Sequence, residues 1–380
     1  MMAYPTQRMQ ADVIIVGGGF MGAATAFFLR QQGLSVILLE RDLVGQAASG
    51  VNFGNVRRQS RFLGQLPLSN RSRDIWVRLP ELIGEDVEFV MSGHILVTTH
   101  EKDGARLEKY AVDCKPYGLD LTIMTGDQAR ARFPMVGPDI RTVSYSPLDG
   151  HANPRLAAPA FGRAARRAGA RIIENTTVTA ITKSTEDFIV ETTTGQSYQA
   201  PLLQVSSGAW GRAMAARFGE DIPFSANGPQ MGVTEPVPYR IEPVIGSSSS
   251  VPEEGVYLRQ VKRGNIVFGG GLRSVANLET RRAPIDPLNT MRQMSHLANL
   301  VPEMARLRII RTWSGVEGYV GDNLPIMGPS GKVAGLFYAF GFCGHGFQLG
   351  PGVGATMAEL IATGKTDIPL EAFDIKRFGS

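Results

Sequence analysis

Cysteine is scarce in this sequence: only Cys114 and Cys343 occur, and they form no CxxC pair. Two isolated thiols exclude a disulfide framework and are typical of a reducing compartment. The sequence also lacks HExxH and any order of Ser, His and Asp that is typical of hydrolases. We therefore expect neither a metal site nor hydrolytic chemistry.

Charged residues are also few. Only 19% of the 380 residues are charged, and the net charge of +4 comes from scattered residues and pairs such as Arg57-Arg58 rather than from long runs. A nucleic-acid partner is therefore not expected. The opening segment, MMAYPTQRMQ, is too short and too polar for a signal peptide. We expect a cytoplasmic protein, and contact with a membrane surface or a partner subunit stays open.

A long uninterrupted apolar run is missing as well. Residues 11–29 are almost wholly apolar, but three consecutive glycines at 17–19 break the run. β-Branched residues gather before the break and helix formers after it, which favours a buried strand and a buried helix over a membrane span. Glycine itself is abundant, and 44 glycines indicate many tight turns or close approaches to a ligand.

The order of expected elements indicates a mixed fold. Val13–Val16 and Ser35–Leu39 are predicted as parallel strands joined by a helix over Phe20–Gln32. Antiparallel strands are predicted later, at Gln230–Pro236, Val256–Gln260 and Asn265–Gly271. We therefore predict the α/β class, with a Rossmann-like domain interleaved with an α+β domain on an antiparallel sheet. The expected bounds are residues 1–90, 146–210 and 312–380 for the first domain, and residues 91–145 and 211–311 for the second.

One glycine motif carries specific chemistry. Residues 17–22, GGGFMG, match G-x-G-x-x-G between the first strand and the helix, and Glu40 ends the next strand. In this motif Gly17 permits the tight turn, Gly19 lets the backbone meet a pyrophosphate, and Gly22 lets the helix pack on the strand. Glu40 is placed to bind ribose hydroxyls, so we predict a dinucleotide site. Its further expected contacts are Phe20, Met21 and Arg41.

Further segments occur in an order that resembles one family. They are VIIVGGGFMGAATAFFLRQQGLSVILLE, GQAASGVNFG, LDGHANP, VSSGAWG, GDNLPIMGP and GFCGHGFQLGPGVG. Over nearly the whole chain they are similar to the FAD-dependent amine and amino-acid oxidoreductases of the D-amino acid oxidase superfamily. The resemblance implies an enzyme that oxidises the C–N bond of an amino acid, imino acid or N-substituted amino acid. Hydride would pass to flavin N5, and water would then hydrolyse the imine.

The resemblance also implies which residues hold FAD. In the family the glycine-rich stretch matching Phe340–Gly354 lies against the flavin ring, and a helix expected to start near Gly352–Gly354 directs its positive end at the ring. The implied contacts are Ser49, Gly50, Asn52, Gly54, Val178, Ser207, Gly208, Gly344, His345, Gly346, Phe347 and Gln348. Covalent attachment is not expected, because the segment WSGVEG lacks the cysteine of relatives with a cysteinyl flavin.

The substrate side resembles the family less closely. Glycine oxidases hold the substrate carboxylate with an arginine where this sequence has Glu317, and sarcosine oxidases use an arginine in the stretch matching Asn55–Arg58. We therefore expect Arg57 or Arg58 to bind a carboxylate, with a solvated surface arginine as the alternative. Glu317 either binds a cationic group of the substrate or forms a structural salt bridge. The other candidates, which contact substrate or flavin or only pack, are Tyr257 and His345.

The expected electron acceptor follows from a missing lysine. Sarcosine oxidases carry lysines beside the flavin where this sequence has Ile266 or Val267, and Gln348. A site without a fixed cation stabilises superoxide poorly, which predicts a dehydrogenase using a quinone or a partner subunit. O2 stays open as the acceptor if a protonated His345 or a nearby arginine supplies the charge instead. Two alternatives stay open, namely a flavoprotein subunit that is active only within a complex and a flavin-binding relative without amine turnover.

Overall fold

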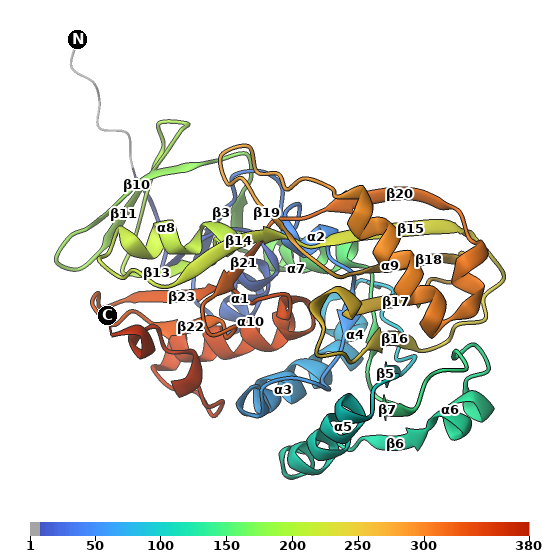
Figure 1. Cartoon of the computed structure of the whole chain (residues 1–380). Coiled ribbons are helices and arrows are strands. Elements are labelled where there is room, and N and C mark those ends of the chain that lie inside the picture. The colour runs from blue at the N-terminus through green and yellow to red at the C-terminus, as the bar shows by residue number, and fades with distance from the viewer. Residues whose placement is uncertain (1–7, 380) are drawn as a thin grey trace.

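The computed structural model describes residues 8–379 and contains two large sheets (Figure 1). The first has six strands in the order β22-β23-β13-β2-β3-β9. Five of them run parallel, and β22 pairs antiparallel with β23 at the edge. The strands are β2 Val13–Val16, β3 Val36–Leu39, β9 Arg171–Ile173, β13 Leu202–Val205, β22 Ile326–Pro329 and β23 Leu336–Phe340. Every residue of β2 and β3 is buried, as expected for a parallel sheet that is covered on both faces.

Alternate residues of β2 face two different cores. Val13 and Ile15 pack in a core with helices, whereas Ile14 and Val16 pack in a core with a smaller sheet. The helices are α1 Phe20–Gln31, α3 Leu66–Val77, α4 Leu79–Ile83, α7 Pro154–Arg167 and α10 Gly346–Thr363. The smaller sheet contains β1 Met9–Gln10, β12 Ser197–Ala200, β11 Phe188–Thr192 and β10 Val178–Lys183. The predicted strand–helix–strand unit is therefore confirmed, with ends that differ by one residue.

Helix α10 begins at Gly346, so the expected start near Gly352–Gly354 is wrong by about two turns. The sequence misled because glycine and proline disfavour helices, and α10 contains both. Close packing explains the glycines. A side chain at Gly350 would collide with the ring of Phe20, one at Gly352 would collide with α3, and one at Gly354 would collide with α1. Burial between α1 and α3 thus overrides the weak local propensity.

The second large sheet has eight strands in the order β20-β15-β18-β17-β16-β5-β7-β6. Its neighbouring strands are antiparallel, except that β16 and β5 run parallel. The strands are β5 His94–Thr98, β6 Thr122–Thr125, β7 Thr142–Ser146, β15 Gln230–Pro236, β16 Val244–Ser247, β17 Val256–Gln260, β18 Asn265–Gly270 and β20 Ile309–Ser314. The α/β class, with a parallel sheet and a largely antiparallel one, is as predicted.

The other elements connect or cover these sheets. The helices are α2 Ala48–Val51, α5 Glu101–Cys114, α6 Gly126–Arg132, α8 Gly211–Ala216 and α9 Pro287–Leu300. The strands are β4 Asn55–Val56, β8 Gly150–His151, β14 Phe224–Gly228, β19 Ser274–Val275 and β21 Glu317–Val320. None of the helices in residues 8–379 combines the length and the apolar character needed to cross a membrane.

Candidate active site

A cavity of about 960 Å³ lies where the carboxyl ends of β2, β3, β13 and β23 face strands β5, β16 and β17. Ligands of open α/β sheets bind at such carboxyl ends, and the opposing sheet supplies the other wall. Most of the predicted site residues line this cavity: Gly17, Gly19, Phe20, Met21, Glu40, Arg41, Ser49, Asn52, Gly54, Arg57, Val178, Ser207, Gly208, Tyr257, Glu317, Gly344, His345, Gly346 and Phe347. Gly22, Gly50, Arg58 and Gln348 do not.

The glycine motif forms a turn that only glycine can make. Gly17 has a φ of +106°, and a side chain there would lie 2.5 Å from the Ser206 carbonyl oxygen. A side chain at Gly22 would collide with the Gly17 carbonyl oxygen and press on Ile15 of β2. Gly22 therefore has the packing role that the motif predicts, although it does not reach the cavity. Gly19 ends the turn and directly precedes helix α1.

The far end of the cavity suits the adenosine half of a dinucleotide. The Glu40 carboxylate accepts hydrogen bonds from the amides of Gly18, at 2.6 Å, and Asp42, at 2.8 Å. Burial raises the pKa of Glu40. Arg41 stacks on the Trp210 ring at 4.3 Å. The buried Ser207 hydroxyl has no partner within residues 8–379, so the turn offers an unused polar atom where FAD is expected.

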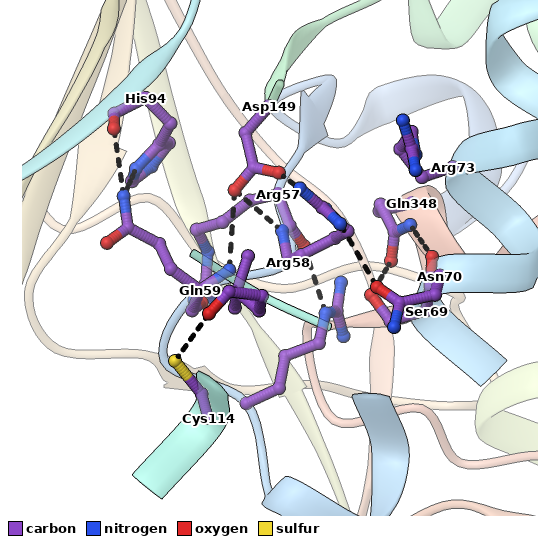
Figure 2. Close-up of polar contacts among 12 residues, drawn as sticks. Arg57, Arg58, Gln59, Ser69, Asn70, Arg73, His94, Cys114, Asp149 and Gln348 are labelled. Atoms are coloured by element: carbon purple, nitrogen blue, oxygen red, sulfur yellow. Dashed lines mark hydrogen bonds and ion pairs between the residues drawn. The ribbon is translucent and has the colours of Figure 1, made fainter. Parts of the chain in front are cut away.

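Gly50 and Gln348 were expected beside the flavin, but neither lines the cavity. A side chain at Gly50 would collide with the Gly45 carbonyl oxygen, so this glycine serves a close backbone approach. Gln348 is buried on α10, where its amide donates to the Ser69 carbonyl and accepts from the Ser69 hydroxyl, both at 2.9 Å (Figure 2). It ties α10 to α3, and we no longer assign it to the cofactor site.

Arg58, one of the two arginines considered for the substrate carboxylate, does not line the cavity either. It is buried, and its Nε lies 3.1 Å from the carboxylate of the fully buried Asp149 (Figure 2). The backbone amides of Arg58 and Gln59 donate to the same carboxylate. Asp149 thus neutralises Arg58 and fixes the loop after β4, and Arg58 is withdrawn from the substrate residues.

Arg61, rather than Arg58, lines the cavity together with Arg57. It is buried with 5% exposure, lines the cavity, and donates to three neutral oxygens, of Arg57, Gln65 and His345, at 2.9–3.4 Å. Arg57 lines the cavity beside it and donates to the Gln59 carbonyl. Within residues 8–379 neither guanidinium has a carboxylate within 4 Å.

Burial and mutual repulsion make this arginine pair electrostatically costly. Burial lowers the pKa of Arg57, and burial together with Arg57 lowers the pKa of Arg61 to about 9. Arg57 is half-buried and Arg61 is buried, and the nearby Asp149 opposes these shifts without forming an ion pair with either guanidinium. An anion that joins them would relieve the remaining cost. The sequence could not single out Arg61, because its spacing from Arg57 follows no regular element.

A second polar group lines the cavity around Glu317. This carboxylate accepts a hydrogen bond from the Tyr319 hydroxyl at 2.8 Å, and burial raises its pKa. Arg273 lies over the Tyr319 ring, 4.5 Å from its centroid, and Tyr257 lines the same part of the cavity. Burial, followed by the charge of Glu317, raises the pKa of Tyr257 to about 12. Tyr319 and Arg273 were missed because they belong to no recognisable motif.

The arginines of the cavity, but not His345, overturn the expectation of a site without a fixed cation. Burial and the nearby arginines hold the pKa of His345 well below its usual value, so this imidazole is neutral. Arg57, Arg61 and Arg273 nevertheless line the cavity. These arginines can supply the positive charge that the missing lysine would give, so its absence does not predict a slow reaction with O2.

Comparisons with known proteins agree with this geometry. Residues 12–360 match the model of the DAO family, described as FAD dependent oxidoreductase. Glycine oxidase of Geobacillus kaustophilus (strain HTA426) is 28% identical over 375 residues, covering 96% of this chain and 97% of that protein. Sarcosine oxidase subunit beta of an Arthrobacter species is 28% identical over 385 residues, covering 99% and 93%. L-Proline dehydrogenase from P. horikoshii has a TM-score of 0.91 at 25% identity, covering 98% and 99%.

Proposed function

Because this chain belongs to the DAO family of FAD-dependent oxidoreductases, we propose that it oxidises the carbon–nitrogen bond of an amino acid or an N-substituted amino acid. Bound FAD supplies the hydride acceptor. Gly17, Gly19, Glu40 and Ser207 are the residues that we propose to hold it. We also propose that residues 1–90, 146–210 and 312–380 bind the cofactor, and residues 91–145 and 211–311 form the substrate domain.

The observation that carries this proposal is the arginine pair. Arg57 and Arg61 present two cations to the cavity, and within residues 8–379 neither has a carboxylate within 4 Å. A substrate carboxylate would accept charge-assisted hydrogen bonds from them and remove their repulsion. It would be held next to His345, whose carbonyl oxygen already contacts Arg61. The relatives described above act on glycine, sarcosine and L-proline by their names, and each of these carries such a carboxylate.

An anaerobic screen tests the proposal. Amino acids, imino acids and N-substituted glycines are mixed with the FAD-loaded protein, and loss of the oxidised-flavin absorbance is followed. We expect one group of carboxylates to reduce the flavin, and the matching methyl esters to fail because they carry no anion. Equal reduction by an ester would remove the arginine pair from substrate binding.

A second candidate is a flavoprotein subunit of a larger complex. The similarity to sarcosine oxidase subunit beta favours it. Strand β20 also forms an edge of the eight-stranded sheet with Ile310 exposed, a feature that often marks a contact surface. Co-purification of a second chain would support this candidate, whereas full turnover by the isolated chain with a dye acceptor would exclude it.

FAD should be bound without a covalent bond. Cys343 is buried in the loop before α10, and burial raises the pKa of its thiol to about 11, so the reactive thiolate is disfavoured. Acid precipitation should therefore release intact FAD into the supernatant. Yellow colour that stays with the precipitated protein would contradict this prediction.

Replacement of Glu40 by alanine should weaken FAD binding. The change removes a carboxylate at the carboxyl end of β3 and frees the amides of Gly18 and Asp42. It also removes the charge-assisted hydrogen bonds that we propose between Glu40 and the ribose hydroxyls, whose loss costs about 1.5–3 kcal/mol, or roughly ten- to a hundredfold in Kd. Titration of the apoprotein with FAD measures the change. Glu191→Ala, on an exposed position of β11, serves as the control and should bind FAD normally.

A further inference from the structure

Two acidic side chains line the cavity within residues 8–379, and they stand in different surroundings. Glu40 is held by two backbone amides at the adenosine end. Glu317 accepts one hydrogen bond, from Tyr319 to Oε2, and no described donor lies within reach of Oε1. No cation lies within 4 Å of Glu317 in the described chain. Glu317 is half-buried, and a carboxylate with a free oxygen on a cavity wall can accept a hydrogen bond from a ligand.

Glu317 also lies beside the loop that holds the other polar group. A Cβ placed on Gly344 would be 3.6 Å from Glu317 Oε2, and the next residue, His345, accepts from Arg61 through its carbonyl oxygen. Glu317 and Arg61 thus flank adjacent residues of one loop. In a substrate with an amine next to its carboxylate, the amine can bind Glu317 while the carboxylate binds Arg61.

We propose that Glu317 is a catalytic residue that removes the proton from the ammonium group of the substrate. The inference rests on the amine oxidation proposed above. An N–H bond of the ammonium breaks, and the proton forms an O–H bond on Glu317. The nitrogen lone pair is then free to form the C=N bond as the Cα–H bond breaks and its hydrogen leaves with the electron pair, which bound FAD would accept. Glu317 later returns the proton to solvent.

This step is needed because Cα cannot release hydride while the neighbouring nitrogen is protonated and has no lone pair to form the C=N bond. An aliphatic amine with a pKa of about 10 is almost fully protonated at pH 7, so its nitrogen has no free lone pair. Burial raises the pKa of the Glu317 carboxyl group and so favours proton transfer to it, whereas the hydrogen bond from Tyr319 and the charge of Arg273 lower that pKa. Tyr257 and Tyr319 face it as neutral phenols because burial raises the pKa of each. Neutral His345 and the cationic Arg273 complete the surroundings, and the arginines of the cavity disfavour another cation.

The test is the pH dependence of a single anaerobic turnover. FAD-loaded wild type and Glu317→Gln are mixed with the most active amino acid of the screen from about pH 6 to about pH 10, and flavin bleaching is followed. At neutral pH the Gln variant should reduce its flavin at least about a hundredfold more slowly. Its rate should recover as the pH rises through the pKa of the free amine, because the neutral amine then enters from solution. Glu186→Gln, on an exposed turn, should behave as wild type.

The possible results separate this inference from the proposed function. A Gln variant with the wild-type rate and pH profile overturns the role of Glu317 alone, and so does a loss that is equal at every pH. Wild type that no amino acid reduces overturns both proposals. Glu317→Asp keeps the carboxylate and should retain the wild-type shape of the pH profile at a lower rate, which provides a second reading if the Gln variant folds poorly.

Discussion

Replacing Arg61 by methionine should raise the Kd of the amino-acid substrate by about ten- to a hundredfold, as expected when a charge-assisted hydrogen bond worth about 1.5–3 kcal/mol is lost. Arg61 is buried, its described partners are neutral oxygens, and Arg57 stands beside it as a second cation. A carboxylate that binds there gains two donors and relieves the repulsion. The FAD content should stay unchanged, because the expected dinucleotide contacts lie on other segments.

The measurement is substrate binding to the FAD-loaded protein, followed through the flavin spectrum under anaerobic conditions. Arg61→Lys keeps the charge but loses the planar fork of the guanidinium, so its Kd should fall between wild type and Arg61→Met. Unchanged affinity in Arg61→Met and in Arg57→Met would place the carboxylate site elsewhere in the cavity. Arg58 is not expected to bind the carboxylate, because Asp149 neutralises it.

Asp149→Asn should destabilise the protein by about 3–5 kcal/mol, the usual cost of removing one partner from a buried ion pair. The carboxylate is fully buried and accepts from the Arg58 side chain and from the amides of Arg58 and Gln59. Asparagine leaves the Arg58 cation buried without a counterion. Urea unfolding of the apoprotein measures the loss of unfolding free energy.

A matched control comes from an exposed ion pair. Asp221 pairs with Arg212 at 2.7 Å on the surface, and Asp221→Asn should leave stability nearly unchanged because solvent screens the pair. The double replacement Arg58→Met with Asp149→Leu should recover most of the lost stability, since it removes both buried charges. A destabilised double variant would show that the amide hydrogen bonds, rather than the ion pair, carry the effect.

The sequence predicted the parts of this molecule that depend on local pattern. The strand, glycine turn and helix over residues 13–31 follow from apolar periodicity and from the φ that Gly17 needs, and both are local properties. Glu40 follows from its place at the end of the next strand. These features together position the dinucleotide end of the cavity.

Features that depend on distant partners could not be predicted. Arg57 and Arg58 are neighbours in sequence, but only the fold brings Asp149 to one of them, 91 residues away. Gln348 could not be separated from the flavin loop, because Ser69, which binds it, lies on another helix. The start of α10 was misplaced for the same reason, since its glycines are explained by contacts with α1 and α3 rather than by local preference.

The central sheet has a consequence for biosynthesis. Its strand β13 lies between β2 and β23, and the loop that follows β23 lines the same cavity as the glycine turn. Residues 17 and 347, which share that cavity, leave the ribosome roughly 15–65 s apart at ordinary rates of translation. The apolar strands β2 and β13 therefore stay exposed until β23 and the start of α10 have been synthesised. Until residues 339–347 have emerged the cavity lacks part of its wall, so bound FAD could stabilise the fold only after they are made.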